Sequence, residues 1–179
     1  MDPQRAGVFR RETRAMGNDT FTVERRTTIS GPPTDVYREL VDFRRWREWS
    51  PWEGLDPTLQ RTYSGPDVGV GSRYAWVGNR KVGAGSMEIT ATDAYTSVDI
   101  RLEFLKPFKA TNQVHIQLDP SGDSPADGGS TRVTWTMTCP KTLATKIMGV
   151  FWSMDKMVGG DFERGLAQLK ALVETTAEA

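Results

Sequence analysis

Residues 31–52 read GPPTDVYRELVDFRRWREWSPW, and this stretch decides the fold. It opens with a proline pair, which ends the strand-like pattern that precedes it. A helix of about two turns is expected next, with Thr34 as its N-cap and with Val36, Leu40 and Phe43 on one face. The stretch therefore predicts a strand that leads directly into a short amphipathic helix.

The same stretch ends in three closely spaced tryptophans, Trp46, Trp49 and Trp52. So much aromatic surface in a short irregular segment must be buried against something, and a hollow fold offers that place. At a spacing of three in a loop, the rings are not expected to point the same way. We expect core filling to dominate, with one ring at a cavity mouth, and Trp49 is counted as a candidate ligand contact.

The composition excludes several classes of protein. The 179 residues carry 23 basic and 23 acidic side chains, so no global field attracts nucleic acid or an anionic membrane. A single cysteine excludes an internal disulfide, and one cysteine with one histidine argues against a zinc site or Cys/His cluster. We expect no metal and no cofactor. No apolar run approaches the roughly 20 residues that cross a bilayer, so stable membrane insertion is not expected. We expect a cytoplasmic protein.

Residues 1–19 show almost no apolar periodicity and predict a flexible N-terminal extension, in which Met16 is an alternative start. Residues 20–175 are expected to form one domain, large enough to bury a core. The oligomeric state is not readable from the sequence.

Alternating apolar and polar residues predict strands through most of the domain. The first runs from Phe21 to Ile29, and Arg25 falls on its apolar side. About six more follow between residues 59 and 138, the clearest being Val98 to Phe104.

From Leu143 to Val173 the apolar spacing changes to three and four, which predicts one long amphipathic helix. The Gly159-Gly160 pair lies in its middle and predicts a kink or break, because two glycines cost about 2 kcal/mol of helix propensity relative to alanine. Close approach of the helix to the sheet explains the pair equally well. The order of elements predicts an α+β fold, an antiparallel sheet with helices on one face and a wide space between them.

This order resembles the START/polyketide-cyclase superfamily (SRPBCC), closest to bacterial members described as polyketide cyclase/dehydrase and lipid-transport-like proteins. Three motifs carry the resemblance, which spans about residues 20 to 174. They are residues 23–25 leading into residues 31–37 and 46–52, the strand at residues 131–137, and residues 157–166 of the helix.

The resemblance implies a helix-grip fold, in which a curved sheet of about seven antiparallel strands wraps a long C-terminal helix, with two short helices after the first strand. It implies a small hydrophobic ligand, such as a lipid, polyketide or aromatic compound, held between sheet and helix. Two alternatives stay open. A cyclase or dehydrase would need an acid/base pair inside the cavity, and a co-chaperone-like interaction module would show a filled cavity and an exposed apolar patch.

Candidate ligand contacts are the residues expected to face that space. Arg25 and Asn112 are polar residues on apolar faces, where a ligand or water could satisfy them. The remaining candidates are aromatic or aliphatic: Trp49, Tyr74, Trp76, Phe104, Trp135, Phe151, Met154 and Val158.

Few residues suit catalysis. His115 lies on the polar side of its strand with Gln113 and Gln117, and we expect a solvated side chain. Cys139 lies on the apolar side and is expected to be a buried, inert thiol. Tyr74 is the best proton donor and Asn112 the other weak catalytic candidate. We expect a binding protein rather than an enzyme.

Overall fold

The computed structural model describes residues 20–107, 109–121, 129–140 and 151–177, with side chains in the last range from Val158 to Thr176. The elements follow the chain in the order β1 (Thr20–Ser30), α1 (Pro33–Val41), a 3₁₀ turn η1 (Arg45–Glu48), β2 (Gln60–Ser64), β3 (Arg73–Val77), β4 (Ala84–Asp93), β5 (Ser97–Lys106), β6 (Ala110–Ser121), β7 (Ser130–Pro140) and α3 (Phe151–Ala177).

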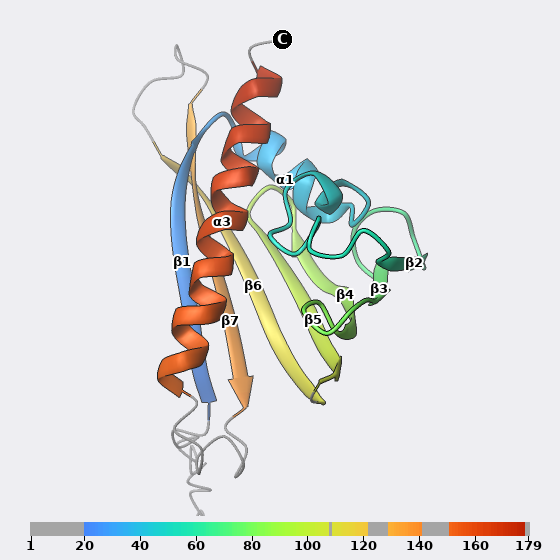
Figure 1. Cartoon of the computed structure of the whole chain (residues 1–179). Coiled ribbons are helices and arrows are strands. Elements are labelled where there is room, and N and C mark those ends of the chain that lie inside the picture. The colour runs from blue at the N-terminus through green and yellow to red at the C-terminus, as the bar shows by residue number, and fades with distance from the viewer. Residues whose placement is uncertain (1–19, 108, 122–128, 141–150, 178–179) are drawn as a thin grey trace, which may run out of the picture.

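The seven strands form one antiparallel sheet in the order β1-β7-β6-β5-β4-β3-β2. The chain therefore brings its first strand beside its last, and the other strands follow as a meander. Figure 1 shows the sheet curving around α3, which lies along β1 and β7, while α1 and the segment after it cover the same face beside α3. This architecture confirms the α+β helix-grip expectation, including two short helical pieces after the first strand.

The alternation of side chains gives the sheet one apolar inner face, turned toward α3. On β6, Val114, Ile116 and Leu118 are buried, while Gln113 and His115 lie on the outer face. Successive residues of a strand point to opposite faces, so a period-2 sequence pattern places all its apolar side chains on one side. The observed alternation of burial along β5, β6 and β7 confirms the strands predicted from Val98 onward.

The expectation that Thr34 caps α1 is wrong. The N-cap is Pro32, which has no side-chain cap hydrogen bond, and the helix begins at Pro33. Proline suits the first helical position because its φ is already near the helical value and its missing N–H needs no partner there. Val36 and Leu40 are fully buried, as the spacing predicted.

The predicted break at the glycine pair is also absent, because α3 is helical from Phe151 to Ala177. The two glycines have different surroundings. A Cβ at Gly159 would lie 2.1 Å from Nη2 of Arg25 on β1, whereas a Cβ at Gly160 would have no neighbour within 4 Å. Gly159 thus allows the close approach of α3 to the sheet, and packing against β1 sustains the helix through residues of low propensity. The expected helix start at Leu143 lies outside the described residues.

The two glycines form a matched pair for a stability test. Gly160→Ala should raise the free energy of unfolding by about 1 kcal/mol, because alanine has the higher helix propensity and nothing blocks its methyl group. Gly159→Ala should give no such gain, because the methyl group must displace the Arg25 guanidinium from its ion pair with Glu163. Urea unfolding of both variants measures the difference. Equal gains would show that the contact at Gly159 does not constrain the helix.

Candidate functional site

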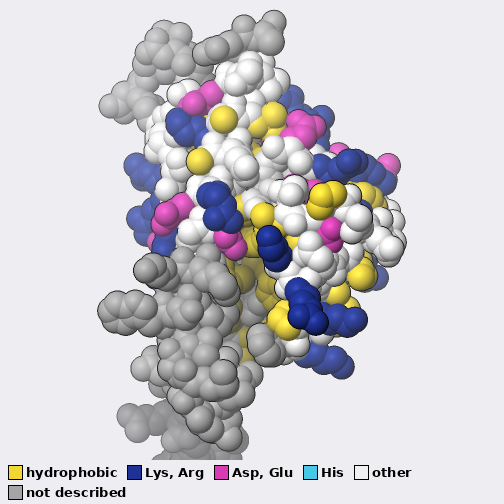
Figure 2. Space-filling view, in the orientation of Figure 1, with side chains coloured by type: hydrophobic (Ala, Val, Ile, Leu, Met, Phe, Trp, Pro, Cys, Tyr) yellow, Lys and Arg dark blue, Asp and Glu magenta, His cyan; other side chains and the backbone are white. Residues whose placement is uncertain are grey.

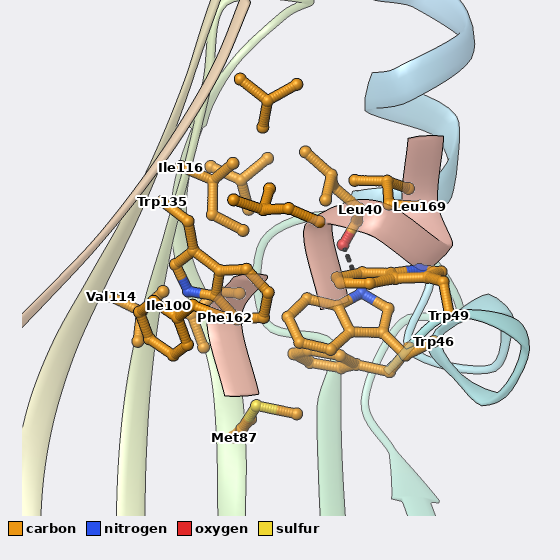
Figure 3. Close-up of a cluster of buried hydrophobic side chains, with 14 of the residues drawn as sticks. Leu40, Trp46, Trp49, Met87, Ile100, Val114, Ile116, Trp135, Phe162 and Leu169 are labelled. Carbon is orange, nitrogen blue, oxygen red and sulfur yellow. Dashed lines mark hydrogen bonds between the residues drawn. The ribbon is translucent and has the colours of Figure 1, made fainter. Parts of the chain in front are cut away.

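An aromatic cluster fills the centre of the space between sheet and helix. Trp135 of β7 stacks on Phe162 of α3 with ring centroids 4.3 Å apart and an interplanar angle of 15°. Trp46 and Trp49 lie 4.5 Å from each other and contact Trp135 edge-on at 6.1 and 5.7 Å, and Trp52 reaches it at 6.2 Å. Figure 3 shows Trp46 and Trp49 side by side, facing Trp135 across the core.

The indole N–H groups of the three clustered tryptophans in residues 46–52 all have protein acceptors. Trp46 donates to the Leu40 carbonyl at 3.0 Å, and Trp49 donates to the Glu39 carbonyl at 3.3 Å. Trp52 donates to the Asp161 carboxylate at 3.1 Å. Core filling therefore dominates in this segment, as expected. Trp49, a candidate ligand contact, is 1% exposed inside the cluster.

Burial of the inner face changes along the strands. On β5, Ile100 is 0% and Leu102 7% exposed, and Phe104 is only half-buried. We call six inner-face residues of the central strands that are 0–1% exposed the closed half: Ile89, Val98, Ile100, Ile116, Leu118 and Val133. The open half is also buried, but less completely, at 3–9% exposure, and it comprises Tyr74, Trp76, Met87, Leu102, Asn112, Val114, Met137 and Cys139.

The open half lies toward the end of the sheet where α3 begins. Figure 3 shows Met87 apart from the aromatic cluster, and Figure 2 shows apolar side chains reaching the surface between α3 and the strands on its far side. Met87, Leu102, Val114 and Met137 were not among the sequence candidates. Each lies on the inner face by the same alternation as the residues predicted there. Its position near the end of a strand was the sequence signal that could have marked it as less completely covered.

Polar groups on and beside this apolar surface lack hydrogen-bond partners within the described part of the chain, among them the buried Tyr63 hydroxyl. The indole N–H of Trp135 is buried and unpaired. Asn112, a polar residue only 4% exposed, lies on the same face, and its amide is not among the fully enclosed unpaired atoms. In Figure 3 the nitrogen-bearing ring of Trp135 lies on the side of Val114 and Ile100, with its six-membered ring toward Trp46. A buried donor without a partner costs roughly 1–3 kcal/mol, which a bound acceptor would recover.

Tyr74 lies in a ladder of aromatic rings on the open half. It stacks against Tyr63 at 5.3 Å and against Trp76 at 5.7 Å, and Trp76 meets Phe104 edge-on at 6.1 Å. Burial raises the pKa of the Tyr74 phenol well above its usual range. The hydroxyl is therefore neutral near physiological pH and suits hydrogen bonding rather than proton abstraction.

The helix candidates are only partly described. Val158 is half-buried and packs against the core. The side chains of Phe151 and Met154 lie outside the described residues. Their predicted contacts with a ligand stay predictions.

Arg25 has protein partners on both neighbouring elements. Its side chain is 27% exposed on the helix-facing side of β1, as the parity predicted. Its Nε donates to Glu163 of α3 at 2.7 Å, and its Nη1 donates to the Glu24 carbonyl at 2.8 Å. The guanidinium therefore ties α3 to the edge of the sheet, and its predicted role in ligand binding stays a prediction.

The two reactive side chains occupy the positions expected of them. His115 is on the outer face, 45% exposed, with Nδ1 2.7 Å from the Asp99 carboxylate and Nε2 3.3 Å from the Gln117 amide oxygen. Cys139 is 8% exposed, and burial raises the pKa of its thiol to about 11. The buried Cys139 thiol therefore lacks the exposure and lowered pKa of a reactive cysteine.

A separate depression of about 250 Å³ lies on the outer face, at β3, β4 and β5. Glu88 pairs there with both Arg73 and Arg101, and Arg101 also pairs with Glu103. The charged side chains that line this depression are therefore paired with one another. In the part of the chain that the structure describes, no cluster of residues could hold a metal ion, and no helix is long and apolar enough to cross a membrane.

The raised pKa of Cys139 predicts slow chemical modification. A thiol-reactive disulfide reagent should react with the native protein at neutral pH far more slowly than with the urea-unfolded chain, because the reactive thiolate is scarce and the sulfur is covered. The release of the coloured thiol measures both rates. Comparable rates would contradict the burial of Cys139.

Similarity to known proteins agrees with this geometry. The chain resembles solved structures of a Staphylococcus aureus protein of unknown function (12% identity, 91% of this chain and 99% of that one, TM-score 0.62) and of the Aha1 dimer from Colwellia psychrerythraea (15%, 86% and 96%, 0.54). It also resembles DynU16, a protein of the dynemicin biosynthetic locus (18%, 89% and 48%, 0.57). At these identities the likeness shows the fold, and no curated protein matches the sequence. The model of the family described as polyketide cyclase / dehydrase and lipid transport matches residues 20–174, so the chain belongs to that family.

Proposed function

We propose that the protein binds a small, largely apolar molecule against the open half of the inner face. The observation that carries the proposal is the change in burial along single strands, from 0% at Ile100 to half-buried at Phe104. The family description, which includes lipid transport, supports the same conclusion.

The affinity would come mainly from apolar contact. Covering apolar surface stabilises a complex by roughly 25 cal/mol per Å², before the costs of association are deducted. Tyr74, Trp76 and Phe104 offer ring faces and edges, while Met87 and Leu102 offer aliphatic surface. This mixture suits a flat or ring-containing guest as well as an alkyl chain.

The polar groups favour a guest with a hydrogen-bond acceptor. Trp135 Nε1–H can only donate, and the Asn112 amide can donate through its nitrogen. No residue of the open half carries a charge at neutral pH, and the guanidinium of Arg25 is engaged by Glu163. We therefore favour a neutral guest with a carbonyl, ester or hydroxyl oxygen over a free carboxylate, whose desolvation would go uncompensated.

A cyclase or dehydrase activity at the same surface is the second candidate, favoured by the first half of the family description. It would use Tyr74 as a neutral donor and Asn112 as an orienting group. Burial raises the Tyr74 pKa, which makes the phenol a reluctant acid. The charged groups that act on its hydroxyl are Glu53, which raises its pKa further, and Arg61, and these two are already paired with each other. We therefore place binding ahead of catalysis.

The binding proposal predicts a co-purifying guest and a site for a neutral dye. Native mass spectrometry before and after denaturing extraction should reveal a bound apolar mass. Nile red, which is uncharged, should bind the delipidated protein with enhanced emission, and Leu102→Trp should weaken binding on the order of tenfold by filling the open half. Val68→Trp, at a residue 54% exposed in a loop, is the matched control and should leave binding unchanged.

Two results would overturn the proposal. One is the repeated absence of any bound mass together with no Nile red binding. The other is binding that Leu102→Trp leaves intact, because the dye would then sit elsewhere.

Asn112 predicts opposite effects on stability and on binding. Asn112→Leu keeps the branched shape of the side chain, although leucine is bulkier, and it replaces a polar amide on the apolar inner face, so the free energy of unfolding should rise by about 1 kcal/mol. The same variant should lose about tenfold in affinity for a carbonyl-bearing dye such as Nile red if the amide donates to it. Thermal unfolding and dye titration measure the two effects. A destabilised variant with unchanged affinity would show that Asn112 serves the fold alone.

A further inference from the structure

The loops at the end of the sheet beside the open half carry an unusual set of basic side chains. Arg80 and Lys81 lie in the loop between β3 and β4, and Lys106 and Lys109 lie where β5 turns into β6. All four are exposed. The two loops are neighbours, because Ala84 at the start of β4 pairs with Lys106 at the end of β5.

These cations differ from most others in their ion pairing. Most basic side chains elsewhere in the described ranges pair with carboxylates, as Arg61 does with Glu53 and Arg44 with Asp67. Within the described ranges, the Lys and Arg side chains without an ion pair are Arg47, Arg80, Lys81, Lys106, Lys109 and Arg132. Four of these six belong to the two adjoining loops. A protein of zero net charge therefore has a local positive surface that its own carboxylates do not neutralise.

Apolar side chains lie among the cations. Val77, the last residue of β3, and Leu105, near the end of β5, are 53% and 52% exposed. Figure 2 shows basic side chains gathered around apolar ones at the lower right of the molecule, where Figure 1 places the ends of these strands. We call these six residues the basic rim: Val77, Arg80, Lys81, Leu105, Lys106 and Lys109.

The basic rim adjoins the open half directly. The Trp76 indole N–H donates to the Val82 carbonyl of the β3–β4 loop at 3.2 Å, and Trp76 also contacts Phe104. Phe104 and Leu105 are consecutive on β5 and face opposite sides of the sheet. A molecule entering or leaving the open half would pass beside the rim.

We propose that the basic rim docks the protein onto an anionic membrane surface, from which the open half takes up or delivers its guest. The uptake or delivery of a guest rests on the proposed function, whereas the docking itself does not. Unpaired cations are attracted to anionic headgroups, and exposed aliphatic side chains enter the headgroup boundary. The exposed side chains between the cations that the structure describes, Val77 and Leu105, are aliphatic and suit the headgroup boundary rather than stacking on bases, which favours a bilayer over a nucleic acid.

Vesicle co-sedimentation tests the docking. The protein should bind phosphatidylcholine vesicles that contain phosphatidylserine, should bind pure phosphatidylcholine weakly, and should dissociate as salt is added. Lys81→Glu with Lys106→Glu should lower the partition coefficient by at least about tenfold. Arg47→Glu with Arg132→Glu makes the same change of net charge at unpaired cations outside the rim, and it should have much the smaller effect. None of these four side chains has an ion pair to lose, and circular dichroism checks folding.

The outcomes separate docking from guest binding because Nile red is neutral and is titrated on the same variants. Equal loss in the two double variants, equal binding to neutral vesicles, or no vesicle binding overturns the docking proposal, even if dye binding persists. Binding to an oligonucleotide in place of vesicles, with the same dependence on Lys81 and Lys106, also overturns it. Vesicle binding without any dye binding would instead overturn the proposed function and leave the rim as a docking surface.

Discussion

The fold depends on the contact between Trp135 of β7 and Phe162 of α3, which stack 4.3 Å apart in the centre of the core. A curved sheet with one apolar face must bury that face, and a single long helix is too narrow to cover it. The Trp135–Phe162 stack sets where the helix crosses the sheet. Trp46, Trp49 and Trp52 then pack around that stack from the segment after α1, so the covering layer is made of side chains from three distant parts of the chain.

This arrangement divides the inner face in two. Toward α1 and the C-terminal end of α3 the strands are fully covered, and Ile89, Ile100 and Val133 have no exposed surface. Toward the beginning of α3 the covering thins, and Met87, Leu102 and Cys139 keep some exposure. The aromatic cluster packs beside the closed half, whereas the residues of the open half keep 3–9% of their surface exposed.

Charge is organised by the same geometry. The Arg25–Glu163 ion pair joins β1 to α3 where Gly159 lets the helix approach the sheet. This pair therefore has a structural role. The outer face pairs its carboxylates and guanidinium groups across β3, β4 and β5. Only the loops beside the open half concentrate unpaired cations within the described part of the chain, and a net charge of zero conceals this asymmetry.

The sequence by itself determined the elements, the inner face of each strand and the family, because alternation and helical spacing are local properties of the chain. It also placed His115 outside, Cys139 inside and Arg25 on the apolar side of β1. Only the tertiary structure decided that Arg25 meets Glu163, 138 residues away, and that α3 continues through Gly159, since both depend on where the helix lies on the sheet. It likewise decided that Trp49 is 1% exposed and Leu102 7%. The alternation of a strand predicts which face a side chain is on, whereas the packing of distant segments sets how completely that face is covered.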